Sequence, residues 1–222
     1  MISTNAYYRT FFIKASDYGT AFALDVDGHQ YLITARHLID TASSQLSLHL
    51  FFQQRWLSLS ATIVGSGRGP VDIVVLKIPI QLVRPEFKFT PSVGEFFFGQ
   101  DVYFMGFPYK MWGDVGALLE GRAAAFVKKG TLSFVSTGAV REFFVDAINN
   151  EGFSGGPMFF YPKQDPNDIR VIGVVSKFRT EREPVVTQTG EATNLEITYN
   201  TGFMLAYGIN HVLDIVRSQY DV

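Results

Sequence analysis

The sequence predicts an all-β fold, and three observations carry this prediction. Short apolar or alternating runs recur along the 222 residues, with Gly, Pro, Asp and Asn between them. Asp27–Gly28 stands between two such runs and is a strong β-hairpin signal. Only residues 207–219 show the 3.6-residue spacing of an amphipathic helix. Many short strands followed by one terminal helix indicate a β-barrel or a β-sandwich.

The predicted strands fall into two groups, one on each side of a proline-rich segment. Residues 79–91 carry three prolines, which interrupt the strand pattern and indicate a linker. We therefore expect a first β unit in residues 1–85, a second in 86–206 and a helix in 207–222. The polar stretch 179–194 is expected to be an exposed loop. The expected strands are residues 18–26, 30–35, 46–52, 56–64, 71–80, 101–107, 121–127, 131–136, 143–148, 157–161 and 170–178.

The composition favours a soluble, folded protein and argues against several classes of function. Hydrophobic residues make up 47% of the chain and charged residues 18%, as is typical of globular proteins. The net charge of −2 gives no indication of a nucleic-acid or membrane partner. The chain has no cysteine, so it has no disulfide framework, thiolate nucleophile or Cys-based metal site. No cofactor or metal motif is found, and the lack of a signal peptide predicts a cytoplasmic location.

One short stretch, EGFSGGPMFF at residues 151–160, is the first candidate for chemistry. It places Ser154 among glycines, directly before an apolar run. A serine in such a place is either a loop residue or a nucleophile held on a shaped backbone. The second interpretation requires an imidazole to take the hydroxyl proton, a carboxylate to orient that imidazole, and donors for an oxyanion.

The chain contains one strong candidate for each of the two partners. Of the four histidines, only His37 directly follows the end of a predicted strand. Asp72 opens a nearly continuous apolar run, where a carboxylate is costly unless it is hydrogen-bonded. The alternative for Asp72 is a turn cap after Gly69–Pro70.

Three blocks of the sequence resemble the trypsin-like, or chymotrypsin-fold, serine peptidases. The blocks are LITARHLI, DIVVLKI and GFSGGPMF, and they follow one another in that family's order of His, Asp and Ser. Residues 18–24, 101–108 and 170–178 extend the resemblance over most of residues 19–178. The spacing is similar to that of bacterial HtrA-type protease domains, without the peptide-binding domain that follows them in full-length members. The resemblance implies two antiparallel six-stranded β-barrels with a C-terminal helix, and a site in the cleft between the barrels.

The resemblance also implies a role for each candidate residue. Ser154 would attack the scissile carbonyl, His37 would act as base and then acid, and Asp72 would orient His37. The backbone N–H groups of Gly152 and Ser154 would form the oxyanion hole. Activity is then expected to rise as His37 loses its proton. The residue before Ser154 is Phe153, where digestive members carry the Asp that pairs with a newly formed N-terminus, so no activation of that kind is expected.

The resemblance assigns the pocket for the substrate residue before the cut to Ile148, Ser176 and Phe178. Ile148 stands where an acid would select basic residues, and Phe178 stands where many members have Gly. We therefore expect a small or medium apolar residue before the cut. The alternative for Phe178 is ordinary core packing.

These observations predict a serine endopeptidase that acts on protein or peptide substrates without a cofactor. The alternative is a catalytically silent or partner-activated protein of the same fold, which would bind peptides or regulate. The sequence does not indicate an oligomeric state.

Overall fold

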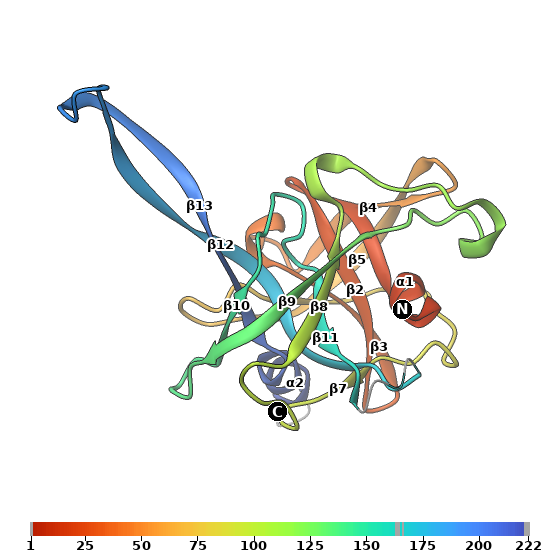
Figure 1. Ribbon diagram of the computed structural model, residues 1–222. Helices are drawn as coiled ribbons and strands as arrows, with labels where there is room; N and C mark the ends of the chain where they lie inside the picture. Colours follow the sequence, from red (N-terminus) through yellow and green to blue (C-terminus); the bar gives the residue numbers. More distant parts are fainter. Residues whose placement is uncertain (1, 163–164, 166, 220–222) are drawn as a thin grey trace.

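The protein, described here from a computed structural model, folds into two β units and a C-terminal helix (Figure 1). The structure describes residues 2–162, 165 and 167–219. The first unit contains the strands β1 (Thr10–Lys14), β2 (Tyr18–Val26), β3 (His29–Thr34), β4 (Gln45–Phe52), β5 (Arg55–Ser66) and β6 (Val74–Lys77). The second contains β7 (Thr90–Pro91), β8 (Asp101–Gly106), β9 (Phe126–Val135), β10 (Glu142–Asp146), β11 (Pro157–Phe160), β12 (Arg170–Val186) and β13 (Ala192–Gly208).

The first unit is a closed barrel with the strand order β1-β2-β3-β6-β5-β4. Pairing of β1 with β4, at Ile13 opposite Leu50, closes the ring. Inward-facing residues such as Leu32, Leu48 and Leu76 are fully buried and form one hydrophobic cluster. The period-two burial of β4 matches the alternation seen in its sequence, because successive side chains of a strand point to opposite faces.

The second unit is a seven-stranded sheet in the order β11-β8-β9-β10-β13-β12-β7. An additional pairing between β11 and β12 brings the sheet back on itself, so it is ring-like. β7 adds to β12 as a short parallel strand. The sequence predicted a second six-stranded barrel, and this prediction is confirmed only in part. The structure has a ring-like sheet with seven strands in place of a clear barrel.

A shared hydrophobic cluster joins the two units and the C-terminal helix. It contains Phe22 from the first barrel, Phe107 and Phe159 from the second unit, and Val212 from the helix α2 (Asn210–Arg217). The helix begins at Asn210 and not at the expected residue 207, because residues up to Gly208 belong to β13. Residues 220–222 of the expected helix lie outside the described residues. The junction between the units is thus packed, and loops from both units meet along it.

Residues 179–194 were expected to be an exposed loop, and this prediction is wrong. Most of them form the ends of β12 and β13, which pair as an antiparallel hairpin that projects far from the body (Figure 1). Both faces of this hairpin are exposed along much of its length. Its sequence therefore lacks the alternation of apolar and polar residues that indicates a half-buried strand. Only residues 187–191 turn the chain around.

A short helix near the N-terminus, α1 (Thr4–Arg9), was also not predicted. Ser3 caps it, because the Ser3 Oγ accepts the Asn5 N–H at 3.3 Å. The helix delivers Arg9 into the interior, where the guanidinium is fully buried and forms an ion pair with Asp25. At six residues the helix is too short to show a periodic apolar pattern.

Candidate active site

His37 and Asp72 meet at one end of the first barrel. His37 lies in the 3-10 turn η1 (Arg36–Leu38) just after β3, and Asp72 lies just before β6, which pairs with β3. The His37 Nδ1 lies 2.7 Å from Asp72 Oδ2, and the His37 backbone N–H donates to Asp72 Oδ1 at 2.9 Å. Antiparallel pairing of the two strands therefore brings together residues that are 35 positions apart.

The surroundings of Asp72 keep it ionised. Burial alone would raise the pKa of Asp72, but hydrogen bonds from the His37 ring, the Ser176 hydroxyl and the His37 backbone outweigh this effect and lower that pKa. The Ser176 Oγ donates to Asp72 Oδ2 at 2.7 Å. Because an ionised carboxylate can only accept, the neutral His37 ring carries its proton on Nδ1 and presents Nε2 as an acceptor.

Ser154 reaches the same place from the second unit. It lies between β10 and β11, and it lines one pocket together with His37. The Ser154 Oγ donates to the Ser176 carbonyl at 2.8 Å, and no hydrogen bond joins Ser154 to His37 in the part of the chain that the structure describes. The Ser154 hydroxyl must therefore exchange the Ser176 carbonyl for His37 as its acceptor before it can transfer its proton.

Gly152 occupies a position that only glycine fits. Its φ is 95°, in the region that L side chains rarely adopt, and a Cβ there would lie 2.2 Å from the Phe107 carbonyl oxygen. Gly155 is similar, with φ 83° and a Cβ position 2.1 Å from the Thr20 carbonyl oxygen. The glycines on both sides of Ser154 thus allow the loop to press against backbone from both units.

The orientation of the 151–152 peptide decides where the Gly152 N–H points. The Glu151 carbonyl accepts the Tyr109 N–H at 3.1 Å, and in a trans peptide the N–H points opposite to the C=O. The Gly152 N–H is therefore directed away from Tyr109. Among the described residues, neither this N–H nor that of Ser154 has an acceptor. Two free backbone donors beside a hydroxyl are the components of an oxyanion hole.

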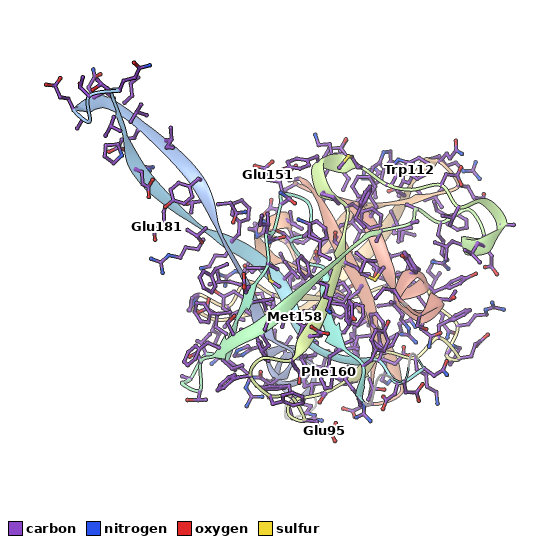
Figure 2. The ribbon with its side chains drawn as sticks, viewed as in Figure 1. Glu95, Trp112, Glu151, Met158, Phe160 and Glu181 are labelled. Atoms are coloured by element: carbon purple, nitrogen blue, oxygen red, sulfur yellow. The ribbon has the colours of Figure 1, made fainter. Side chains whose placement is uncertain are left out.

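Tyr109 contacts this loop, which bears the candidate oxyanion donors, in two ways. Besides its N–H bond to Glu151, the Tyr109 hydroxyl accepts the Asn150 Nδ2 at 3.0 Å. Tyr109 and Lys110 both have left-handed backbones, with φ of 52° and 65°, which is uncommon for residues other than glycine. Such backbone strain is often found at functional sites. Glu151 itself is exposed on the loop between β10 and β11 (Figure 2).

Thr20 of β2 ties the first barrel to the loop that carries Ser154. Its backbone N–H donates to the Ser154 carbonyl at 3.0 Å, and its Oγ1 donates to the Gly152 carbonyl at 2.6 Å. The same Oγ1 accepts the Phe107 N–H at 3.2 Å. Thr20 is fully buried, so these bonds are shielded from water. These bonds therefore fix the position of the Ser154 loop relative to the barrel that carries His37.

Lys128 of β9 supports the other end of this loop. Its Nζ donates to the Ile148 carbonyl at 2.6 Å and to the Asn150 Oδ1, and it lies 5.2 Å from the centre of the Phe153 ring. Burial lowers the pKa of Lys128. No carboxylate pairs with this ammonium among the described residues, so loop oxygens and an aromatic face compensate its charge.

The predicted pocket residues are placed differently from one another. Ser176 is buried beside Asp72 and Ser154, as described above. Phe178 is half-buried on β12, two residues further on. Ile148 is 61% exposed and does not line the pocket that contains Ser154 and His37. The roles of Ile148 and Phe178 in substrate selection stay predictions.

The described residues contain no group of three or more His, Asp or Glu that could hold a metal ion. Within the same residues, no helix is both long enough and apolar enough to span a membrane.

The pocket beside Ser154 is lined by side chains of both charges, which are the acidic Asp17 and Glu151 and the basic Lys110.

A closed six-stranded barrel, a ring-like sheet and a C-terminal helix together are the architecture of the chymotrypsin-like folds. A model of the trypsin-like peptidase domain matches residues 19–174 of the chain. The chain therefore belongs to the trypsin-like peptidase family. No curated protein sequence matches it.

Solved structures with the same fold include proteases of the HtrA type. The active form of the Rv3671c protease from M. tuberculosis is 16% identical with a TM-score of 0.59, over 96% of this chain and 81% of that one. The HtrA-type protease AlgW, solved with a tripeptide, is 20% identical with a TM-score of 0.59, over 97% of this chain and 61% of that one. Deg5 is 18% identical with a TM-score of 0.58, over 95% and 88%.

Three residues at the site were missed by the sequence analysis, which are Thr20, Tyr109 and Lys128. Thr20 left a usable signal, because a threonine inside the apolar run YGTAFAL must find partners when buried. Lys128 left a weaker one, as a charged residue within a strand. Tyr109 left none, since its role depends on a left-handed backbone that no local motif indicates.

Proposed function

We propose that the protein is a serine endopeptidase with Ser154 as nucleophile, His37 as general base and Asp72 as the orienting carboxylate. The observation that carries this proposal is the bond of His37 Nδ1 to Asp72, which leaves Nε2 available in the pocket shared with Ser154. The free N–H groups of Gly152 and Ser154 support an oxyanion hole beside it.

The reaction follows from these positions. The Ser154 oxygen bonds to the scissile carbonyl carbon as its proton moves to His37 Nε2, and the former carbonyl oxygen becomes an oxyanion. His37 then gives this proton to the leaving amine as the C–N bond breaks, which produces an acyl-enzyme. Water attacks the ester in the same way, with His37 again taking and returning a proton, and releases the acid and free Ser154.

A fluorophosphonate probe tests the nucleophile directly. We expect one probe adduct per chain, located at Ser154 by peptide mass spectrometry, because an activated serine attacks phosphorus and expels fluoride. The Ser154→Ala variant should fold and take no label, whereas Ser133→Ala, which changes an exposed serine of β9, should label like the parent. Absence of label on folded parent protein between pH 6 and 9 would exclude the proposal.

The residue preferred before the cut is proposed to be small or medium and apolar, because neither Ile148 nor Phe178 offers a countercharge. Peptides that differ only at this residue should show kcat/KM for Val, Ala or Leu at least about tenfold above that for Lys or Arg. The measurement is steady-state kinetics on the series. Faster cleavage after Lys or Arg would refute the preference while leaving the peptidase proposal standing.

A second candidate, a partner-activated protease, is favoured by the resting position of Ser154. Its hydroxyl is bonded to the Ser176 carbonyl and not to His37, so the proton relay is not assembled. If the parent takes the fluorophosphonate label only after addition of cell extract or a peptide, the protein is a partner-activated protease and is not constitutively active. Labelling at the same rate with and without these additions argues against it.

A further inference from the structure

The hairpin formed by the outer parts of β12 and β13 is an exposed two-stranded ribbon. Figure 1 shows it projecting from the body, and Figure 2 shows Glu181 on the projecting part. Every residue from 179 to 199 is exposed or only half-buried. An isolated two-stranded hairpin is marginally stable in water, whereas three or more strands with an apolar face can be stable. A second layer over one face would therefore stabilise this hairpin.

One face of the hairpin is formed by the odd-numbered residues of both strands. Glu181 pairs with Tyr199, and residues directly opposite each other on two strands point to the same side. Glu183 pairs with Ile197 in the same way, and the Tyr199 hydroxyl donates to Glu183 at 2.8 Å. Arg179 forms an ion pair with Glu181 at 2.7 Å. These contacts place all five side chains on one face, which we name the outer face.

The outer face continues onto the outside of the second β unit. Met204 of β13 is fully buried in the hydrophobic cluster of that unit. Its neighbours Phe203 and Leu205 therefore point outward, since successive side chains of a strand alternate. Leu205 lies opposite both Phe144 of β10 and Lys177 of β12. The register shift at the base of the hairpin skips an even number of residues on each strand, so the odd-numbered residues stay on this face.

An apolar stripe follows β13 along the outer face. Its members are Leu195, Ile197, Tyr199 and Phe203, whose exposed fractions are 61%, 52%, 40% and 41%. The opposite face of the same stretch carries only the polar residues Glu196, Thr198 and Asn200. Large apolar side chains that gather on one exposed face indicate an interaction surface.

β12 carries four charges beside this stripe, in the order plus, plus, minus, minus. They belong to Lys177, Arg179, Glu181 and Glu183, at every second position of the strand. A second copy of this pattern that runs in the opposite direction places its negative charges against the positive charges of the first. The pattern is therefore self-complementary about a point between Arg179 and Glu181. The Arg179–Glu181 pair within each chain is compatible with this, because a guanidinium has five donors.

We propose that two copies of the chain associate through the outer faces of their hairpins, which run antiparallel about a two-fold axis near Thr180. An axis that lies between two packed ribbons, perpendicular to their strands, places β12 over β12 and β13 over β13. Lys177 then faces Glu183 of the second copy, and Arg179 faces Glu181 of the second copy. The two hairpins together form a four-stranded sandwich with two layers.

The same axis brings the two apolar stripes together. Tyr199 of one copy lies at the level of Phe203 of the other, because both are close to the axis on opposite sides of it. Ile197 lies further out, so it meets the surface that Leu205 and Phe144 form in the second copy. Charged and apolar contacts therefore require one and the same arrangement.

A second copy fits the outer face better than a lipid surface does. The anionic headgroups of a membrane would repel Glu181 and Glu183, which lie beside the stripe. In the dimer, both carboxylates face cations. The inference goes beyond the proposed function and is independent of it, since the contact uses neither Ser154 nor His37.

The first test is sedimentation velocity of the full chain from about 1 to about 100 µM. The Ser154→Ala protein is used so that no chain is cleaved during the run. We expect a monomer–dimer equilibrium with a Kd of about 10 µM, because the contact is smaller than that of a permanent dimer. A monomer at every concentration would overturn the proposal. Flotation of this monomer with phosphatidylserine-containing vesicles would assign the stripe to a lipid surface instead.

The second test locates the contact on one face of the hairpin. Ile197→Asp places a charge in the apolar stripe and should raise the dimer Kd at least tenfold, to about 100 µM or above. Its matched control, Thr198→Asp, places the same charge on the opposite face of the same strand and should keep the Kd within about twofold. Equal effects of the two substitutions would show that the dimer uses another surface.

The third test uses the charge pattern. Lys177→Glu and Glu183→Lys, each alone, place like charges opposite each other in the dimer, so each variant should stay monomeric at concentrations where the parent dimerises. An equal mixture of the two variants restores opposite charges at both contacts and should dimerise. Thermal unfolding checks that both variants are folded. A mixture that stays monomeric, or single variants that dimerise like the parent, would contradict the antiparallel arrangement.

Discussion

Replacement of Asp72 with Asn is expected to lower kcat/KM for a peptide substrate by about four orders of magnitude. Asp72 accepts from the His37 ring, the His37 backbone and the Ser176 hydroxyl, so it acts only as an acceptor. An amide NH2 in place of Oδ2 would face the ring with a donor and favour the tautomer with its proton on Nε2. That tautomer cannot take the proton of Ser154.

The structural cost of Asp72→Asn is expected to be small beside its effect on rate, because the two side chains have the same shape. Asp40→Asn is a suitable control, since Asp40 is exposed and near His37 in sequence but not bonded to it. Steady-state kinetics with thermal unfolding would separate loss of activity from loss of fold. A variant that keeps a tenth or more of the parent kcat/KM would show that Asp72 does not orient the base.

The same substitution has a signature in stability against pH. The hydrogen bonds that lower the pKa of Asp72 below its ordinary value of 3.8 stabilise the fold only while Asp72 is ionised. Their contribution is therefore complete above the unfolded-state pKa and is lost as the pH falls through the lower folded-state pKa. The free energy of unfolding, measured with urea between pH 6 and pH 2.5, should fall more steeply with decreasing pH for the parent than for Asp72→Asn.

The sequence was sufficient to single out the residues of the candidate site that leave a local pattern. A histidine after a strand, an aspartate before an apolar run and a serine among glycines each leave a mark that can be read in a few residues. The pairing of β3 with β6 then brings His37 and Asp72 into contact. The all-β class could be predicted for the same reason, because strand alternation is visible wherever one face is buried.

The rest depended on contacts between distant segments. The projecting half of β12 and β13 has no buried face, so its sequence resembles that of a loop. The helix α1 is too short to show a period. The support of the candidate oxyanion loop comes from Thr20 and Lys128, which are more than 20 residues from Ser154 in sequence and reach it through β2 and β9. No local pattern specifies such contacts.

Lys128→Met is expected to lower kcat by about a hundredfold, within the range seen when one oxyanion donor is lost, with little change in KM. Lys128 holds the Ile148 carbonyl and the Asn150 side chain, and Asn150 in turn bonds the Tyr109 hydroxyl. If this loop moved, the partly buried ammonium would lose its only oxygen partners among the described residues. An unpaired charge in such a place is costly, so the charge and the loop hold each other in position.

Lys129→Met is the matched control, because Lys129 is the next residue of β9 and its side chain is 54% exposed, paired with Asp101 on the surface. Exposed ion pairs contribute little, so this variant should keep kcat within about twofold of the parent. Lys128→Arg retains the charge and should recover part of the lost rate. The rate of fluorophosphonate labelling should fall in parallel with kcat, since both reactions use the oxyanion donors.

Equal kinetics for Lys128→Met and Lys129→Met would show that Lys128 has no part in ordering the loop. If Lys128→Met instead lowered the thermal stability and raised KM with kcat unchanged, its role would be structural. The predicted pattern is a loss in kcat at constant KM on a folded protein. That pattern would mean that, where digestive members use an Asp before the nucleophile and a new N-terminus, this chain uses a lysine from β9 with Phe153 beneath it.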